Sequence, residues 1–412
     1  MSRLLPGFLL LTLLICLSTG LQAQNLYSIT GTVKDKKGET LPGAGIYLSG
    51  YTVATVANND GQFNLSKLKP GSYEVVVQMI GFLPYSKSVI IGDKSVDITI
   101  VLAENTIQLN EVVIRSDPDR EKNLQIFKDF FIGKTPNSAQ CKILNPNVLF
   151  IKYDKETKVL SVTTNEFLVV ENKALGYQLK YMLSLFEYNY NSRIISFSGL
   201  PVFEDLKGSA KKRKEWLERR ENAYHGSPQH FFQALYRNSS AEDGFIIYKR
   251  VHVQNPNRPS DSLLAAMRTR LLRKAPGSMM RVGSVEVDSL TILKHLYELP
   301  KEYLVLDTNA VNPDTLVKHF YPNRRTLNFK DELYVMYTRE RESNGYSSTG
   351  HYIMRPLFIP NYQVSIVRQL SGSFSFYANG GMHDNRSVLY EGFWAYEKIG
   401  DMVPIDYMPL KR

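Results

Sequence analysis

The stretch that decides the fold of the N-terminal part begins with YSITGTV (residues 27–33), continues with YEVVVQM (73–79) and closes with VDITIVL (96–102). Apolar and polar residues alternate in each segment, and this period of two places one face of a strand in a core and the other in water. Turn-forming pairs such as Pro42-Gly43 and Asp60-Gly61 separate the segments. The pattern therefore predicts an all-β, Ig-like or transthyretin-like sandwich of seven short strands.

The residues ahead of the sandwich predict export. Phe8 to Leu17 is almost wholly apolar, but at about ten residues it is too short for a bilayer-spanning helix of about 20. A small residue, Ala23, then offers a cleavage site, so we expect residues 1–23 to be a signal peptide that is cut before Gln24. A short anchor helix is the alternative. The mature protein is expected to be periplasmic or associated with the outer membrane.

Cysteine usage and length restrict how this chain is stabilised. Cys16 lies in the expected signal peptide and follows Ile15, where a lipid-modified cysteine would follow a small residue. Cys141 then remains as the single thiol, which cannot form an intramolecular disulfide. Stability must come from apolar burial, and 412 residues suggest two or three domains.

A set of short motifs gives the sandwich a family resemblance. The motifs are Gly31-x-Val33, Leu41-Pro42-Gly43-Ala44, Asn59-Asp60-Gly61-x-Phe63, Leu68-x-Pro70-Gly71-x-Tyr73 and Ile80-Gly81-Phe82. Residues 25–104 resemble the carboxypeptidase D regulatory-like domain, a transthyretin-like sandwich that is abundant in secreted proteins of Bacteroidota. The resemblance implies a fold and no catalysis, because in carboxypeptidases this domain is a non-catalytic appendage.

A second resemblance follows the sandwich. Residues 109–114 read LNEVVI and are similar to the segment that comes after this domain in TonB-dependent outer-membrane receptors. Those receptors continue with a plug and a barrel of 22 strands, for which the rest of this chain is too short. We interpret Val112 to Ile114 as an edge strand or connector, and residues 105–120 as a linker.

Residues 121–412 predict a strand-rich α+β region of unknown function. Helical periodicity occurs at 121–132, 207–224, 228–236 and 263–273. In the second of these helices we expect one face to be buried, formed by Trp216, Leu217, Ala223 and Tyr224, and the basic side chains to project outward. Ser227-Pro228 should cap the third helix. Strand patterns occur at 148–153, 159–164, 177–185, 193–203, 333–338, 364–370, 374–378 and 387–396. A polar loop at 254–262 marks a sub-boundary. Four motifs make this region resemble uncharacterised portions of envelope proteins, a resemblance that implies no known activity: Asn145-Pro146-x-Val148, Glu171-Asn172-Lys173-Ala174-Leu175-Gly176-Tyr177, Gly226-Ser227-x-x-His230-Phe231 and Tyr390-Glu391-Gly392-Phe393-Trp394.

The search for catalytic chemistry gives one weak match. His295 and Glu298 have the spacing of a zinc pair, with His319, His351 or His383 as a conceivable third ligand, but we interpret the pair as part of an ordinary helix end. We interpret Cys141 as a small buried hydrophobe. The sequence contains no Gly-x-Ser-x-Gly elbow, no Walker loop and no calcium loop. We expect no cofactor, no metal and no catalytic residue.

Two basic clusters stand out from the formal net charge of +10. The first comprises Lys207, Lys211, Lys212, Arg213, Lys214, Arg219 and Arg220. The second comprises Arg268, Arg270, Arg273 and Lys274. In an exported protein such clusters fit anionic lipid headgroups, lipopolysaccharide or acidic glycans, and nucleic acid is not an expected partner. Interleaved glutamates also allow the first cluster to be a solvated helix face.

The leading interpretation is a non-enzymatic envelope protein. Its sandwich would act as an interaction or stability module for a C-terminal region that binds an envelope protein, a glycan or an anionic membrane surface. One alternative is a hydrolase with its site in the C-terminal region, which a bound-metal assay would detect. The other is a small transport accessory associated with the outer membrane, which solubility without detergent would test.

Overall fold

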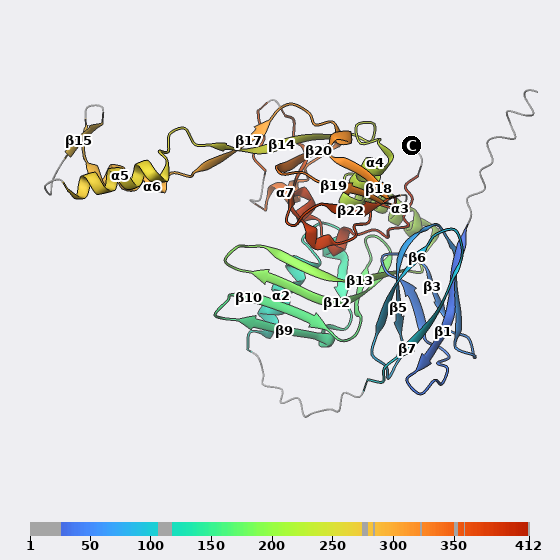
Figure 1. Ribbon diagram of the computed structural model, residues 1–412. Helices are drawn as coiled ribbons and strands as arrows, with labels where there is room; N and C mark the ends of the chain where they lie inside the picture. Colours follow the sequence, from blue (N-terminus) through green and yellow to red (C-terminus); the bar gives the residue numbers. More distant parts are fainter. Residues whose placement is uncertain are drawn as a thin grey trace, which may run out of the picture. The chain divides into compact units, whose positions relative to one another are not determined.

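The computed structural model describes residues 26–105, 118–273, 279–282, 285–321, 324–349, 353–357 and 359–410 (Figure 1). The expected signal peptide, its cleavage site between Ala23 and Gln24, and most of the expected 105–120 linker lie outside the described residues. The chain divides into two compact units. Unit 1 runs to His225 and resumes at Glu397, whereas unit 2 comprises Gly226–Tyr396. The loop at 254–262 lies inside unit 2.

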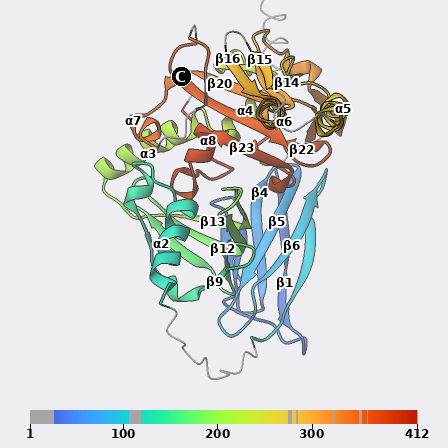
Figure 2. The same cartoon turned by 90° about the vertical axis from the view of Figure 1, so that its left-hand side faces the viewer.

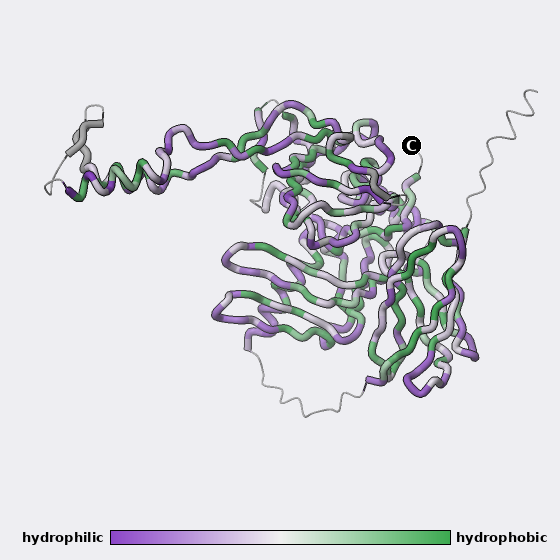
Figure 3. Tube along the Cα trace, viewed as in Figure 1, coloured by the Kyte–Doolittle hydropathy of each residue, from purple (hydrophilic) through white to green (hydrophobic). Residues whose placement is uncertain are grey.

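The N-terminal part of unit 1 is the predicted sandwich. Its strands are β1 (Tyr27–Asp35), β2 (Gly45–Leu48), β3 (Ala54–Val56), β4 (Gln62–Leu68), β5 (Gly71–Gln78), β6 (Tyr85–Ile91) and β7 (Val96–Leu102). They form a three-stranded sheet, β4-β1-β7, and a four-stranded sheet, β3-β2-β5-β6. Ile29, Val75 and Ile100 are fully buried between the sheets, and Figure 3 shows the hydrophobic segments of these strands. The seven-strand prediction is confirmed.

The rest of unit 1 is a six-stranded sheet with helices. Its elements are α2 (Arg120–Phe131), β8 (Cys141–Ile143), β9 (Leu149–Asp154), β10 (Val159–Thr164), β11 (Leu168–Asn172), β12 (Tyr177–Asn189), β13 (Ile195–Asp205) and α3 (Ala210–Tyr224). The order is β8-β11-β12-β10-β9, with β13 along the other side of β12. Phe127 and Phe131 of α2 pack on the sheet against Phe186, so α2 covers one face (Figure 2).

The long strand β12 departs from the alternation expected for it. Tyr177, Leu179, Tyr181 and Leu183 face the core as predicted, but the expected inward position of Leu185 is wrong. The register with β13 shifts between Leu183 and Leu185, which is a β-bulge. The extra residue reverses the phase of the strand, so that Phe186 is the next buried side chain.

The sandwich contacts the edge strand β13 through the turn between β2 and β3. The Gly50 amide donates to the Pro201 carbonyl at 2.6 Å, and the Phe203 amide donates to the Tyr51 carbonyl at 3.2 Å. The Ile405 amide donates to the Gly50 carbonyl at 2.7 Å, so the C-terminal segment holds the same turn. These contacts cover part of an edge that would otherwise present unpaired backbone groups.

Unit 2 is built on a five-stranded antiparallel sheet, β17-β14-β20-β21-β23, and a three-stranded sheet, β18-β19-β22. Its elements are α4 (Pro228–Arg237), β14 (Phe245–Gln254), α5 (Asp261–Leu272), β15 (Met279–Val282), β16 (Val285–Asp288), α6 (Ser289–Glu298), β17 (Glu302–Asp307), β18 (Val317–Tyr321), β19 (Arg324–Leu327), β20 (Glu332–Arg341), α7 (Asn344–Ser347), β21 (Tyr362–Gln369), β22 (Phe374–Tyr377), β23 (Val388–Gly392) and α8 (Phe393–Tyr396). Among the described residues, none of the helices has the length and apolar character needed to cross a bilayer.

Helix α4 supplies much of the core of unit 2. The Ser227 hydroxyl accepts from the His230 amide at 3.2 Å and caps the helix, as the Ser227-Pro228 pair predicts. Phe231 and Phe232 are buried against residues of both sheets. The strand expected over 387–396 is shorter than predicted, because Gly392 adopts a positive φ of 78° and the next four residues turn into α8.

Candidate functional site

A groove of about 370 Å³ lies in unit 1 beside helix α3. It is lined by Gln140, Glu171, Lys173, Leu206, Lys207, Lys212, Glu215, Trp216 and Arg219. These residues come from three places in the chain: the segment before β8, the β11–β12 turn, and the segment from the end of β13 into α3. The groove is therefore a product of tertiary packing.

Trp216 anchors helix α3 against the rest of unit 1. Its first turns consist of strong helix formers, and the Ser209 hydroxyl caps it by accepting from the Lys212 amide at 3.4 Å. The Trp216 ring lies between two glycines: a Cβ on Gly176 would come within 2.1 Å of the ring, and a Cβ on Gly208 within 2.4 Å. Its indole nitrogen donates to the Lys173 carbonyl at 3.0 Å. The ring thus forms a rigid wall of the groove.

The β11–β12 turn carries Lys173 into the groove. The Asn172 side chain accepts from the Leu175 amide at 3.0 Å and donates to the Gly400 carbonyl at 2.9 Å. Gly176 completes the turn with a φ of 70°, a conformation that favours glycine. The hydrogen bonds of the buried Asn172 thus fix the backbone conformation of the turn that contains the exposed Lys173.

The groove has an excess of positive charge. Four of its lining side chains are basic and two are acidic. The Lys173 ammonium pairs with Glu171 at 3.3 Å. Lys207, Lys212 and Arg219 have no ion-pair partner among the residues that the structure describes. Three basic groups that form no ion pair with an acidic side chain of the described residues are therefore available to an anionic ligand.

The structure sorts the seven basic residues of the first cluster into three groups. Lys207, Lys212 and Arg219 line the groove. Lys211, Arg213 and Lys214 are exposed on α3 and do not line it.

The outward projection predicted for the seventh residue, Arg220, is wrong. Its guanidinium lies over the Tyr177 ring at 3.7 Å, pairs with Asp205 at 2.8 Å and donates to the carbonyls of Leu175 and Gly176. Arg220 ties α3 to the sheet, and burial raises the pKa of Tyr177, which keeps its hydroxyl neutral.

Other expectations for α3 have a mixed outcome. Trp216, Ala223 and Tyr224 are buried as predicted, whereas Leu217 is 45% exposed and its predicted burial is wrong. Sequence reasoning also missed Gln140, Glu171 and Lys173 as lining residues. No pattern in the sequence indicated that the turn from Asn172 to Gly176 lies beside α3.

A second polar cluster in unit 1 is structural. The Asp401 carboxylate is buried, accepts from the Thr135 hydroxyl at 2.8 Å and from the Asn137 amide at 3.0 Å, and joins the C-terminal segment to the α2–β8 connection. Burial raises the pKa of Cys141 to about 12, and Asp401 adds to this effect. A thiol with so high a pKa is a poor nucleophile at neutral pH.

The weak zinc match lies in α6. Glu298 pairs with Lys294 at 3.8 Å, one turn away. No group of three or more His, Cys, Asp or Glu side chains in the described part of the chain is arranged to hold a metal ion.

Comparisons with known proteins identify the sandwich. A family model for the CarboxypepD_reg-like domain matches residues 29–114. These residues form a CarboxypepD_reg-like domain. The match begins in β1, covers the remaining strands of the sandwich and ends in the segment that follows β7. The resemblance expected from the sequence motifs is confirmed for this part of the chain.

A curated relative is similar to about a quarter of the chain. The TonB-dependent receptor SusC of Bacteroides thetaiotaomicron is 34% identical over 109 residues, which is 26% of this chain. The matched stretch corresponds to 10% of the length of that receptor. The similarity supports an envelope-associated or outer-membrane-associated protein.

Similar solved structures cover about a fifth of the chain. A pilus 2b backbone protein of group B streptococcus is 22% identical, with a TM-score of 0.18 over 19% of this chain and 42% of that one. A catechol 1,2-dioxygenase of Acinetobacter sp. ADP1 is 8% identical, with a TM-score of 0.18 over 21% of this chain and 54% of that one. These values are too low to support an inference about function.

Proposed function

We propose that this chain is an exported, non-enzymatic envelope protein that binds an acidic glycan in the groove beside α3. The observation that carries the proposal is that Lys207, Lys212 and Arg219 line one groove without acidic partners among the described residues. Lys212 and Arg219 lie on α3 and Lys207 precedes the helix, and several separate positive charges suit a polyanion better than a single small anion.

The CarboxypepD_reg-like domain acts in this proposal as a stability module. Its β2–β3 turn covers the β13 edge, and Tyr47 packs edge-on against Phe167 at a centroid distance of 6.0 Å. Val76 and Val202 are buried in the same small cluster. The domain thereby supports the sheet that positions the β11–β12 turn and α3.

The test compares two triple variants that reverse the same number of charges in the same region. In the groove variant, Lys207→Glu, Lys212→Glu and Arg219→Glu are combined. In the matched control, Lys211→Glu, Arg213→Glu and Lys214→Glu are combined. Calorimetric titration of the mature protein with polygalacturonate at low salt should show binding to wild type and control, and none to the groove variant.

Three outcomes would overturn the proposal. Equal loss of binding in both variants would show that net charge and not the groove attracts the polymer. Equal binding of a neutral polysaccharide would remove the role of charge. Tighter binding of polyglutamate than of polygalacturonate would assign the groove to an acidic protein segment. Thermal unfolding of each variant shows whether a loss of binding reflects a loss of folding.

A further inference from the structure

The polar cluster around Asp401 is joined to the groove beside α3 by a short 3-10 turn. The Asp401 carboxylate accepts hydrogen bonds from Thr135 and Asn137, in the connection between α2 and β8. The turn η1 (Ser138–Gln140) follows directly, and its last residue, Gln140, lines the groove. The Gln140 carbonyl also accepts from the Lys173 amide at 3.2 Å. The residues that bind Asp401 are thus continuous with one wall of the groove.

A second contact joins the same cluster to the β11–β12 turn. The Gly400 carbonyl, one residue before Asp401, accepts from the Asn172 side chain at 2.9 Å. The packing at Gly400 is close, since a Cβ there would come within 2.3 Å of the Ser138 hydroxyl oxygen. The segment around Gly400 and η1 therefore cannot separate without disturbing Asn172, which fixes the turn that contains Lys173.

The carboxyl of Asp401 has no cation to balance its charge. It is 8% exposed and forms no ion pair with a basic side chain of the described residues. The Cys141 thiol of β8 is neutral, because burial raises its pKa to about 12. Lys134, in the α2–β8 connection, pairs with Asp129 at 2.7 Å. Lys398 is three residues before Asp401, and burial lowers the pKa of its ammonium to about 8.

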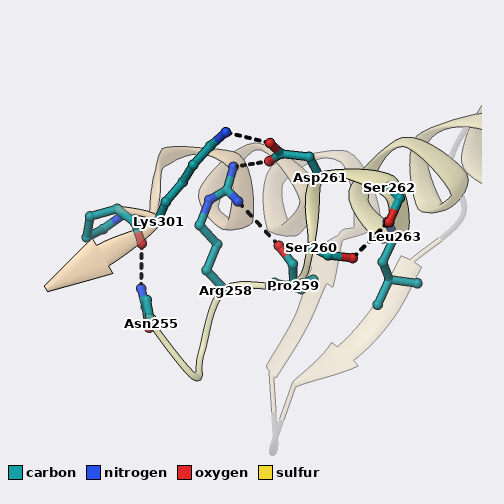
Figure 4. A network of polar contacts seen from close by, with 9 residues as sticks. Asn255, Arg258, Pro259, Ser260, Asp261, Ser262, Leu263 and Lys301 are labelled. Carbon is teal, nitrogen blue, oxygen red and sulfur yellow. Dashed lines mark hydrogen bonds and ion pairs between the residues drawn. The ribbon is translucent and has the colours of Figure 1, made fainter. Parts of the chain in front are cut away.

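A polar network in unit 2 shows the opposite surroundings for an aspartate (Figure 4). Asp261, at the start of α5, is exposed and pairs with Lys301 and with Arg258, the latter at 2.8 Å. Hydrogen bonds from Lys301 and Arg258 lower the pKa of Asp261, so its carboxylate is ionised at neutral pH. Asp401 has burial in place of exposure and neutral donors in place of cations.

Burial without a cation makes ionisation of Asp401 costly in the folded protein. Burial raises the pKa of the carboxyl from 3.8 to about 6, although Thr135, Asn137 and the Lys398 backbone stabilise the ionised form. Contact with water removes this cost, and water reaches the carboxylate when η1 and the segment around Gly400 separate. Ionisation therefore shifts the population toward molecules in which these segments, and the groove walls joined to them, are displaced.

We propose that the charge on Asp401 controls the groove: the neutral carboxyl keeps the groove walls ordered, and the ionised carboxylate loosens them. An acidic glycan should then bind more tightly below the pH at which Asp401 ionises than above it. Asp401 does not line the groove, so it is a positioning residue that acts through Gln140 and Asn172. Linkage requires the reverse effect, so bound glycan should favour the neutral carboxyl. The inference rests on the proposed function and adds its regulation.

The test follows the affinity for sulfated dextran, an acidic glycan whose sulfate groups keep their charge over the pH range used. In calorimetric titrations of the mature protein at low salt, the affinity should fall about tenfold more in wild type than in Asp401→Asn between pH about 5 and about 7. Asparagine has the size of the neutral carboxyl. Asp129→Asn is the matched control, since it removes the same charge from α2 and should keep the pH dependence of wild type.

A third variant separates control by the carboxyl from a loss of structure. The Asn137 amide stabilises the ionised form of Asp401, so Asn137→Ala should move the midpoint of the binding profile upward by about 0.5–1 pH unit. A merely structural role for Asn137 would lower the affinity and leave the midpoint in place. This readout also decides the matter if Asp401→Asn fails to fold.

Hydrogen exchange tests the same control without a ligand. The Lys173 amide bonds to Gln140 and the Leu175 amide to the Asn172 side chain. After correction for the intrinsic effect of pH on exchange, protection of both amides should fall between pH about 5 and about 7 in wild type and stay constant in Asp401→Asn.

The outcomes distinguish this inference from the proposed function. Equal pH dependence of binding in wild type and Asp401→Asn, or tighter binding by wild type at the higher pH, would overturn the control by Asp401 and leave glycan binding in place. No binding of sulfated dextran at either pH would overturn the proposed function. Hydrogen exchange would then decide the inference by itself, and constant protection in wild type would overturn it.

Discussion

At the scale of single residues, the fold changes the chemistry of Asp401 most clearly. Burial raises the pKa of its carboxyl from 3.8 to about 6, although hydrogen bonds from Thr135 and Asn137 lower it. Between pH about 4 and about 6, the Asp401 carboxyl is therefore protonated in the folded state and ionised in the unfolded chain. The free energy of unfolding consequently falls as the pH rises through this range. Relative to an Asp401→Asn variant, wild type should lose on the order of 3 kcal/mol of unfolding free energy between pH about 4 and about 7.

Denaturant unfolding of wild type and Asp401→Asn at a series of pH values measures this difference. The other carboxylates titrate in both proteins, so their contributions cancel when the two curves are subtracted. Parallel curves across the whole range would show that Asp401 titrates in the folded protein as it does in the unfolded chain.

At the scale of elements, α3 separates a buried anchor from an exposed charged surface. Trp216 is 8% exposed, and its ring fills the slot between Gly176 and Gly208, so Trp216→Ala should lower the free energy of unfolding by about 3–5 kcal/mol. Lys212 is exposed, and Lys212→Ala should change it by less than about 0.5 kcal/mol. Urea unfolding of the two variants measures both effects. Equal destabilisation by the two substitutions would contradict the position of the ring.

At the scale of the whole molecule, the CarboxypepD_reg-like domain has a core of its own. Apart from Val76, which packs with Phe167 and Val202, its buried hydrophobic residues form one cluster whose members all lie between Ile29 and Leu102. A fragment of residues 25–104 should therefore unfold in a single cooperative thermal transition, followed by circular dichroism. A chain that lacks this fragment should be less soluble, because the β13 edge loses its contacts with Gly50 and Tyr51.

The outcome that would contradict domain autonomy is a disordered spectrum for the fragment. Such a result would mean that the β2–β3 turn needs β13 and the Ile405 contact in order to form. Solubility of the truncated chain equal to that of the full chain would show instead that the β13 edge is protected without the sandwich.

Local sequence patterns were sufficient to predict most of the strands and helices of this protein. Alternation and turn residues were enough for the sandwich, and the Ser227-Pro228 pair was enough for the start of α4, because strand period, turn dihedrals and helix caps depend on neighbours in the chain. Even in β12 the alternation held as far as Leu183. It failed at Leu185, since a bulge depends on the register with another strand.

Where these elements meet depends on packing between distant parts of the chain. Lys173 and Lys212 share a groove because Trp216 seats α3 against the β11–β12 turn. Arg220 belongs to the same basic run in the sequence, yet its guanidinium packs over the Tyr177 ring and points toward the sheet. Charge patterning showed that the run existed, but which of its members face a ligand depends on contacts between residues distant in the sequence. Local periodicity cannot encode such contacts.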